Sequence, residues 1–177
     1  METIYEKDIY VKRIMAVERD PMPAAHKNTP TTGELDVISQ WGLVIEGFQN
    51  TNKKVHAEVS SAFSLEPAEA ETLLRLVRTP GERMPMAKLA REVAFSNGGF
   101  TKIADRLAKR SLVQRSPCAE DRRVVYLELS PQGKETANEL ACFVAGLVRS
   151  AYVDILGEDR ARLVAEAMAE LREANDA

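Results

Sequence analysis

Hydrophobic side chains recur every three or four residues from Glu34 onward, which is the period of an amphipathic helix. The pattern predicts a helix over residues 35–62, and at 1.5 Å per residue it would be about 40 Å long. Residues 20–33 hold three prolines and a glycine, so we predict an N-terminal arm and linker over residues 1–34. The apolar positions of the helix are Val37, Ile38, Trp41, Val44, Ile45, Phe48, Val55 and Val59.

Three shorter helices are predicted next, and their order is typical of a helix-turn-helix. The first begins at Pro67, a residue favoured at the first helical position, and stops at residues 79–81. A short helix follows Pro85, and after a tight turn a third helix covers residues 97–110, with Ser96 as its N-cap. The apolar stripe of this third helix consists of Phe100, Ile103, Ala104 and Leu107.

Two predicted strands, residues 112–115 and 124–129, flank a polar segment that is typical of a hairpin tip. Ser130-Pro131 then opens a long helix that ends at Gly157, and residues 158–173 form a last helix. The order of elements predicts a mainly α (α+β) fold, namely a winged helix-turn-helix with long N- and C-terminal helices.

The distribution of charge says more about the partner than the net charge does. The chain has 177 residues and a formal net charge of −3 at pH 7. Residues 96–123 contain seven Lys or Arg and three Asp or Glu, a local charge of +4, so the remainder carries −7. A basic block on an acidic body is typical of a surface that binds phosphate groups, and an ordinary solvated helix face is the alternative.

Six short motifs occur in the order and at the spacing of a known family. They are Leu65-Glu66-Pro67-Ala68-Glu69, Leu89-Ala90, Thr101-Lys102-Ile103-Ala104-Asp105-Arg106-Leu107, Leu112-Val113-Gln114-Arg115, Asp121-Arg122-Arg123 and Leu127-Glu128-Leu129-Ser130-Pro131-Gln132-Gly133-Lys134. Over about residues 35–175 the chain resembles the MarR family of winged-helix regulators. The resemblance implies a DNA-binding transcriptional regulator, most often a repressor that binds a pseudo-palindromic operator as a homodimer and is released by a small, often phenolic, ligand.

With this resemblance, each part of the chain receives a predicted role. The parts are an arm and linker (1–34), a dimerisation helix (35–64), a DNA-binding winged helix-turn-helix (65–130) and C-terminal dimerisation helices (131–177).

The predicted DNA contacts lie on the third short helix and on the hairpin tip. The side of the helix opposite the apolar stripe carries groups that can address base edges or phosphates in a major groove. The resemblance points to Arg123 as the arginine that enters a minor groove, with Asp121 as a tether for the tip and Arg122 on a backbone phosphate. The candidates on the helix are Ser96, Asn97, Gly98, Thr101, Lys102 and Arg106.

The expected partners are double-stranded DNA, a second copy of the chain and a small aromatic or phenolic ligand. The apolar stripes of the terminal helices have no partner in the small winged core, and packing against a second copy would bury them. Such a homodimer would hold two recognition helices about one DNA turn, roughly 34 Å, apart. Trp41 as an aromatic wall and Arg115 as a cation predict a ligand site; a core Trp and a structural or phosphate-facing Arg are the alternatives.

Two other interpretations stay open at this point. Cys118 lies among the arginines of the hairpin tip and could act as a redox sensor, although an inert exposed thiol is the simpler interpretation. Cys142 is predicted to lie in the core. The second alternative is a winged-helix module that binds other proteins and does not contact DNA.

The sequence argues against several other classes of protein. It has no nucleotide-binding loop, hydrolase elbow or zinc-protease motif, so we predict neither an enzyme nor a cofactor. Two histidines and two cysteines without ligand spacing predict no metal site. The chain also has no apolar run of about 20 residues and no basic-then-apolar start, which predicts a cytoplasmic protein without a membrane partner.

Overall fold

The computed structural model describes residues 29–93, 97–118, 120–121 and 123–175. The chain divides into two compact units, Met1–Gly42 and Leu43–Ala177, and helix α2 (Thr32–Phe63) continues from the first into the second. In the first unit, N and Oγ1 of Thr31 donate to the Glu34 carboxylate at 2.7 and 2.8 Å and cap the start of α2. These two hydrogen bonds hold the pKa of Glu34 below its ordinary value.

Helix α2 contributes little to the hydrophobic core. Val55 and Val59 are its only buried residues, and both lie in its last three turns. Large apolar side chains of the earlier turns are exposed to solvent: Leu35, Val37, Ile38, Trp41, Leu43, Val44, Ile45 and Phe48.

The helix-turn-helix follows α2 and begins at a well-defined cap. Glu66 and Glu69 form a capping box, in which each side chain accepts from the other residue's backbone N–H, and Pro67 occupies the first turn. Gly81 adopts a φ of 75°, a conformation that glycine tolerates best. The elements in this part of the chain are α3 (Pro67–Val77), η1 (Pro80–Glu82), β1 (Arg83–Pro85), α4 (Met86–Glu92) and α5 (Asn97–Lys109).

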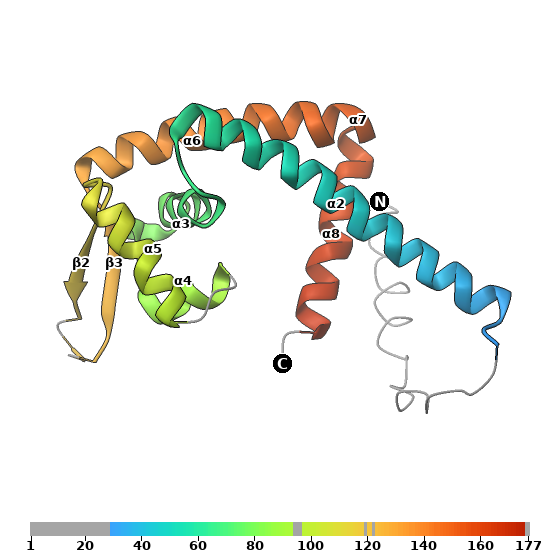
Figure 1. Cartoon of the computed structure of the whole chain (residues 1–177), viewed down its shortest axis with the longest axis horizontal. Helices are drawn as coiled ribbons and strands as arrows, with labels where there is room; N and C mark the ends of the chain where they lie inside the picture. Colours follow the sequence, from blue (N-terminus) through green and yellow to red (C-terminus); the bar gives the residue numbers. More distant parts are fainter. Residues whose placement is uncertain (1–28, 94–96, 119, 122, 176–177) are drawn as a thin grey trace, which may run out of the picture. The chain divides into compact units, whose positions relative to one another are not determined.

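The wing is an antiparallel hairpin formed by β2 (Val113–Pro117) and β3 (Val125–Leu129). The short strand β1 pairs with the other edge of β3, which gives the strand order β1-β3-β2. Pairing reaches the end of the strands, where Pro117 lies opposite Val125. In Figure 1 the hairpin lies beside α5 and extends away from the long helix α6 (Pro131–Val148).

The core of the second unit joins α3, α4, α5, the sheet and the start of α6. Gly133, in the first turn of α6, packs against the Leu112 carbonyl so closely that a Cβ atom would lie 1.7 Å from its oxygen. Ser130 caps α6 by accepting from the Gly133 backbone N–H. The largest fully buried side chains are Phe100, Leu65, Leu73, Leu76, Leu89, Leu107, Leu127, Leu140 and Thr72.

The C-terminal part bends once and leaves apolar side chains exposed. A π-helical turn η2 (Arg149–Val153) joins α6 to α7 (Asp154–Leu156), and Gly157, with a φ of 80°, precedes α8 (Glu158–Asn175). Ile155, Leu163, Val164, Met168 and Leu171 are exposed. Within the described residues, no single helix has the length and hydropathy needed to span a membrane, although the helices on either side of Gly157 meet these criteria as a pair bent by 104°.

The winged helix-turn-helix with long terminal helices is confirmed, with three local differences from the sequence analysis. The sequence pattern did not reveal β1, because a strand of three residues is too short to show a period. Strand β2 starts and ends later than predicted, at Val113 and Pro117. Cys142, predicted in the core, is exposed, because it points away from the face of α6 that carries Ala137 and Leu140.

Candidate nucleic-acid interface

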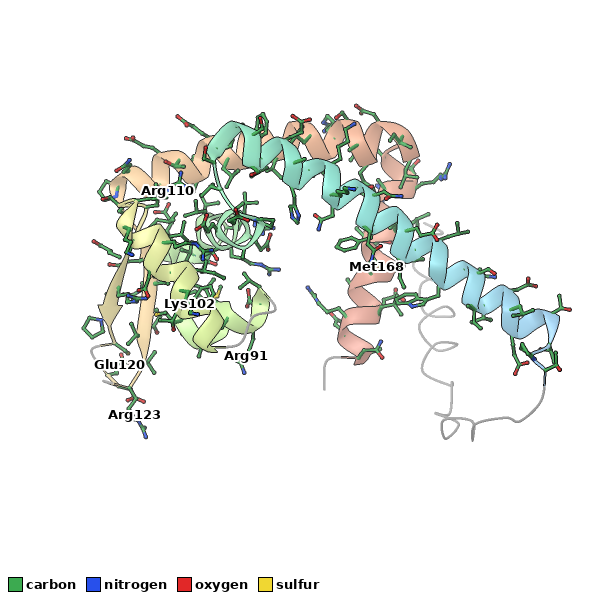
Figure 2. The ribbon with its side chains drawn as sticks, in the orientation of Figure 1. Arg91, Lys102, Arg110, Glu120, Arg123 and Met168 are labelled. Atoms are coloured by element: carbon green, nitrogen blue, oxygen red, sulfur yellow. The ribbon has the colours of Figure 1, made fainter. Side chains whose placement is uncertain are left out.

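Helix α5 has one face in the core and one face in solvent. Phe100, Ile103 and Leu107 are at most 3% exposed. Because the helical period is 3.6 residues, Thr101 and Lys102 lie away from this stripe, and both are exposed. Figure 2 shows Lys102 on α5. Among the described residues Lys102 forms no ion pair, so its charge is available to a partner.

A hollow lies between α5 and the first turn of α3. Its lining combines the N-terminal turn of α3, which has a positive dipole end and the Glu66 carboxylate, with α5 residues that include the cations Lys102 and Arg106. The lining residues are Glu66, Pro67, Ala68, Gly99, Lys102, Ile103 and Arg106.

Arg106 has a partner inside the fold, which the sequence analysis did not anticipate. Its Nε donates to Oε1 of Glu69 on α3 at 2.6 Å. The Glu69 side chain is 5% exposed and that of Arg106 is 49% exposed. The guanidinium therefore lies at the surface of α5 with its charge balanced by a buried carboxylate.

Arg115, predicted as a ligand-binding cation, also pairs within the protein. Its Nη2 lies 2.8 Å from Oδ1 of Asp105 on α5 and donates to the Thr101 carbonyl oxygen at 3.5 Å. These contacts join β2 to α5. Arg115 therefore has a structural role in the fold, which was one of the alternatives to ligand binding.

At the wing tip, Asp121 and Arg123 pair with each other. The Asp121 carboxylate accepts from the backbone N of Arg123 at 2.9 Å, from its Nε at 3.2 Å and from its Nη2 at 3.3 Å. These bonds, the side-chain bond first, hold the pKa of Asp121 below its ordinary value. The Arg123 side chain is 91% exposed, and Figure 2 shows it at the far end of the hairpin. It is positioned by a local contact and otherwise faces solvent.

Three predicted DNA contacts lie wholly or partly outside the described residues. Ser96 and Arg122 are among the residues that the structure does not describe. Of Asn97, the structure describes only the helical backbone. Gly98 is exposed in the first turn of α5.

Trp41 and Arg115 belong to different units of the chain. Trp41 is 56% exposed on the first-unit part of α2, so it is not a core residue of that unit. In the second unit, a pocket of about 190 Å³ opens between α2, α3 and α6, and its described lining does not include Arg115. The lining residues are Phe48, Thr51, Asn52, Val55, His56, Val59, Pro67, Ala70, Glu71, Leu74, Val144 and Val148.

Two further residues connect α5 to its neighbours, and sequence reasoning did not single them out. Glu69 lies in one of the six motifs, and its spacing from Glu66 is that of a capping box. Arg110 donates from Nη1 to the Ser64 carbonyl at 2.8 Å and from Nη2 to the Phe63 carbonyl at 3.1 Å. No sequence signal indicates either long-range partner, because the partners lie 37 to 47 residues away.

The three helices α3, α4 and α5 and the β2–β3 hairpin make this a winged helix-turn-helix protein. Residues 65–125 match the model of the MarR family. The chain shares this family match with solved structures that are described as MarR family transcriptional regulators. It is 31% identical over 68 residues to YhbI of Bacillus subtilis (strain 168), described as an HTH-type transcriptional regulator. The match covers 38% of this chain and 44% of that relative.

Solved structures share the fold over most of the chain. AbsC from Streptomyces coelicolor, a MarR family transcriptional regulator, is 25% identical with a TM-score of 0.66, over 84% of this chain and 93% of that chain. Sco3205 from the same organism, solved in complex with DNA, is 22% identical with a TM-score of 0.72. The match covers 85% of this chain and 92% of Sco3205. A mutant MarR from E. coli, complexed with operator DNA, is 19% identical with a TM-score of 0.64. The match covers 77% of this chain and 95% of that chain. At 22% and 19% identity, the similarity to Sco3205 and to the E. coli MarR mutant shows a shared fold only.

Proposed function

We propose that the protein is a DNA-binding transcriptional regulator that binds a pseudo-palindromic operator as a homodimer. In this proposal α5 enters the major groove and the wing tip enters the neighbouring minor groove. The observation that carries it is the pair of exposed cations, Lys102 on α5 and Arg123 at the wing tip, on a MarR-family fold. A module that only binds proteins would have no need for cations at both places.

The two cations suit different features of DNA. Lys102 and Thr101 lie on the exposed side of a helix, where they can donate to base edges and phosphates in a major groove. Arg123 extends from a hairpin, and an arginine so placed is attracted to the negative potential of a narrow A·T minor groove. Sequence selectivity within a half-site therefore comes mainly from α5, and preference for A·T-rich flanks comes from the wing.

Exposed apolar side chains on the terminal helices support the homodimer. Leu43, Val44 and Phe48 on α2 and Leu163 and Val164 on α8 are all at least 40% exposed. Exposure of so many large apolar side chains is unfavourable in a monomer, and a second copy offers the same surface in return.

An inverted-repeat duplex tests DNA binding and dimerisation together. With half-sites one helical turn apart, it should bind much more tightly than a scrambled duplex of equal length, and affinity should fall steeply with salt. Lys102→Ala should weaken operator binding, whereas Lys54→Ala, which removes the same charge from an exposed position on α2, should not. A monomer in sedimentation at micromolar concentration, or equal affinity for both duplexes, would contradict the proposal.

The pocket between α2, α3 and α6 supports regulation by a small aromatic or phenolic ligand, as a repressor would need. A cavity of about 150 Å³ is enough for a benzene ring, so about 190 Å³ admits one substituted ring. Phe48, Leu74 and Val144 provide apolar walls. The carboxylate of Glu71 is already paired with Arg75 at 2.7 Å. His56 and Asn52 remain as donors to a polar group of the ligand.

Such a ligand would act by favouring an arrangement of the helices that does not fit DNA. A 100-fold loss of DNA affinity needs roughly 2.8 kcal/mol of coupling between the two sites. Salicylate-like compounds should raise the unfolding temperature and release DNA, and Val144→Phe, which narrows the pocket, should abolish both effects while DNA binding persists. Release by peroxide that is lost in Cys118→Ser would replace this mechanism with a redox one.

A further inference from the structure

The pairing of Arg106 with Glu69 changes how the charge of α5 should be counted. Along the sequence, residues 96–123 carry +4. In space, Glu69 adds a negative charge from α3 at 2.6 Å from Arg106. Asp105 balances Arg115 and Asp121 balances Arg123 in the same block. In the N-terminal half of α5, Lys102 is a cation that has no carboxylate partner among the described residues.

The ion pair between Glu69 and Arg106 is part of the fold, because the Glu69 carboxylate is buried and both of its oxygens are hydrogen-bonded. Its Oε2 accepts from the backbone N of Glu66 at 3.0 Å as part of the α3 capping box, and its Oε1 accepts from Arg106. The side chain is only 5% exposed. A buried carboxylate needs both a counter-charge and hydrogen bonds, and here each oxygen has one partner. The same carboxylate thus fixes the start of α3 and a point on α5 37 residues away.

We propose that Glu69 is a positioning residue for DNA recognition, which holds Arg106 against α3 and cancels its charge. This inference rests on the proposed DNA binding and deepens it. Arg106 then connects α5 to α3 through its hydrogen bond to Glu69 and does not neutralise a phosphate. Lys102 provides the charge of α5 toward DNA, and Glu69 keeps binding to unrelated sequences low by removing one positive charge from the interface.

The dependence of DNA affinity on salt measures this cancellation directly. Affinity falls as salt rises, and each phosphate that a protein neutralises adds about 0.9 to the magnitude of the slope of log affinity against log salt. Changes in the slope below refer to this magnitude. Lys102→Gln removes one such contact from each protomer, so it should lower the slope of the homodimer by about 1.8. Glu69→Gln releases the charge of Arg106, so it should raise the slope by about the same amount and increase affinity for a scrambled duplex more than for the operator. The double variant Glu69→Gln/Arg106→Gln should have the slope of the unchanged protein.

Two controls separate this effect from net charge and from damage to the fold. Glu139→Gln removes one negative charge from an exposed position on α6 and should leave the slope unchanged. Arg106→Gln alone leaves the buried Glu69 carboxylate without its counter-charge, so it should lower the unfolding temperature more than the double variant does. This second comparison needs no DNA.

The outcomes distinguish the inference from the function on which it rests. If the unchanged protein binds no duplex, the proposed function fails, and the charge count toward DNA fails with it. If Lys102→Gln lowers the slope but the double variant lowers it equally, Arg106 contacts a phosphate and the inference is wrong. If Glu69→Gln leaves both the slope and the ratio of operator to scrambled affinity unchanged, Glu69 has no role in DNA recognition.

Discussion

Helix α5 and the wing both present arginines, but the protein holds them in different ways. Arg106 of α5 contacts α3, and Arg110, directly after α5, contacts the end of α2, both far away in the sequence. Arg123 at the wing tip contacts Asp121, two residues away, and its side chain is 91% exposed. A side chain with distant partners supports the fold as well as any ligand contact. Changes to side chains of α5 that contact other elements should therefore alter stability and binding together, whereas changes at the wing tip should alter binding alone.

Phe100→Ala should have the largest effect on the free energy of unfolding. Phe100 is 1% exposed and fills the core beneath the recognition face of α5. Removing a buried phenyl ring leaves a cavity and should cost about 3–5 kcal/mol. Urea denaturation measures the change. A loss below 1 kcal/mol would mean that α5 is no better anchored than the wing, and the contrast between the two elements would fail.

Gly133→Ala should show that the wing is fixed at its base although its tip is exposed. A Cβ at this position would lie 1.7 Å from the carbonyl oxygen of Leu112, directly before β2. Because backbone atoms block the methyl group, α6 must shift, and such overpacking should cost about 1–3 kcal/mol. Gly146→Ala, also in α6 with no atom near its added methyl, is the matched control and should be neutral or slightly stabilising. Equal effects of the two substitutions would contradict this interpretation.

The same contrast explains what the sequence could and could not reveal. Periodicity placed Phe100, Ile103 and Leu107 in the core, because a helix with one apolar face has one way to bury it. Two strand-like runs around a polar segment also predicted the hairpin, and Ser130-Pro131 predicted the start of α6. These features depend on residues close together in the sequence, so local rules suffice to predict them.

Features that depend on a distant partner were not accessible in this way. Periodicity showed that Arg106 faces away from the stripe, but it did not show that Glu69, 37 residues earlier, lies beside it. The sequence likewise did not show that Asp105 pairs with Arg115 at 2.8 Å. A charged side chain has a predictable direction on a helix, whereas its ion-pair partner follows from how the helices pack.

Arg110→Ala should have a moderate effect on stability. The guanidinium donates to the carbonyls of Phe63 and Ser64, where α2 ends, and a cation there also interacts favourably with the helix dipole. Because the site is exposed, the loss should be about 1 kcal/mol. Lys109→Ala, its exposed neighbour on α5, should cost less than 0.5 kcal/mol. If the two variants unfold at the same denaturant concentration, Arg110 does not join α5 to α2.

Arg123→Ala should have the smallest effect on stability and a clear effect on binding. The side chain is almost fully exposed, so the free energy of unfolding should change by less than about 0.5 kcal/mol. Affinity should fall by about 1–3 kcal/mol for operators with A·T-rich flanks and less for G·C-rich flanks.

The wing tip should also be insensitive to pH over the neutral range, because pairing with Arg123 lowers the pKa of Asp121 below its ordinary value of 3.8. The carboxylate is therefore charged at pH 5–8, and the tether is lost only as the pH falls through that lowered pKa. Fluorescence anisotropy with the two flanking sequences at pH 5.5 and 7.5 measures both effects. An Arg123→Ala loss that is equal for both flanks would show that the wing contacts phosphates and does not read the minor groove.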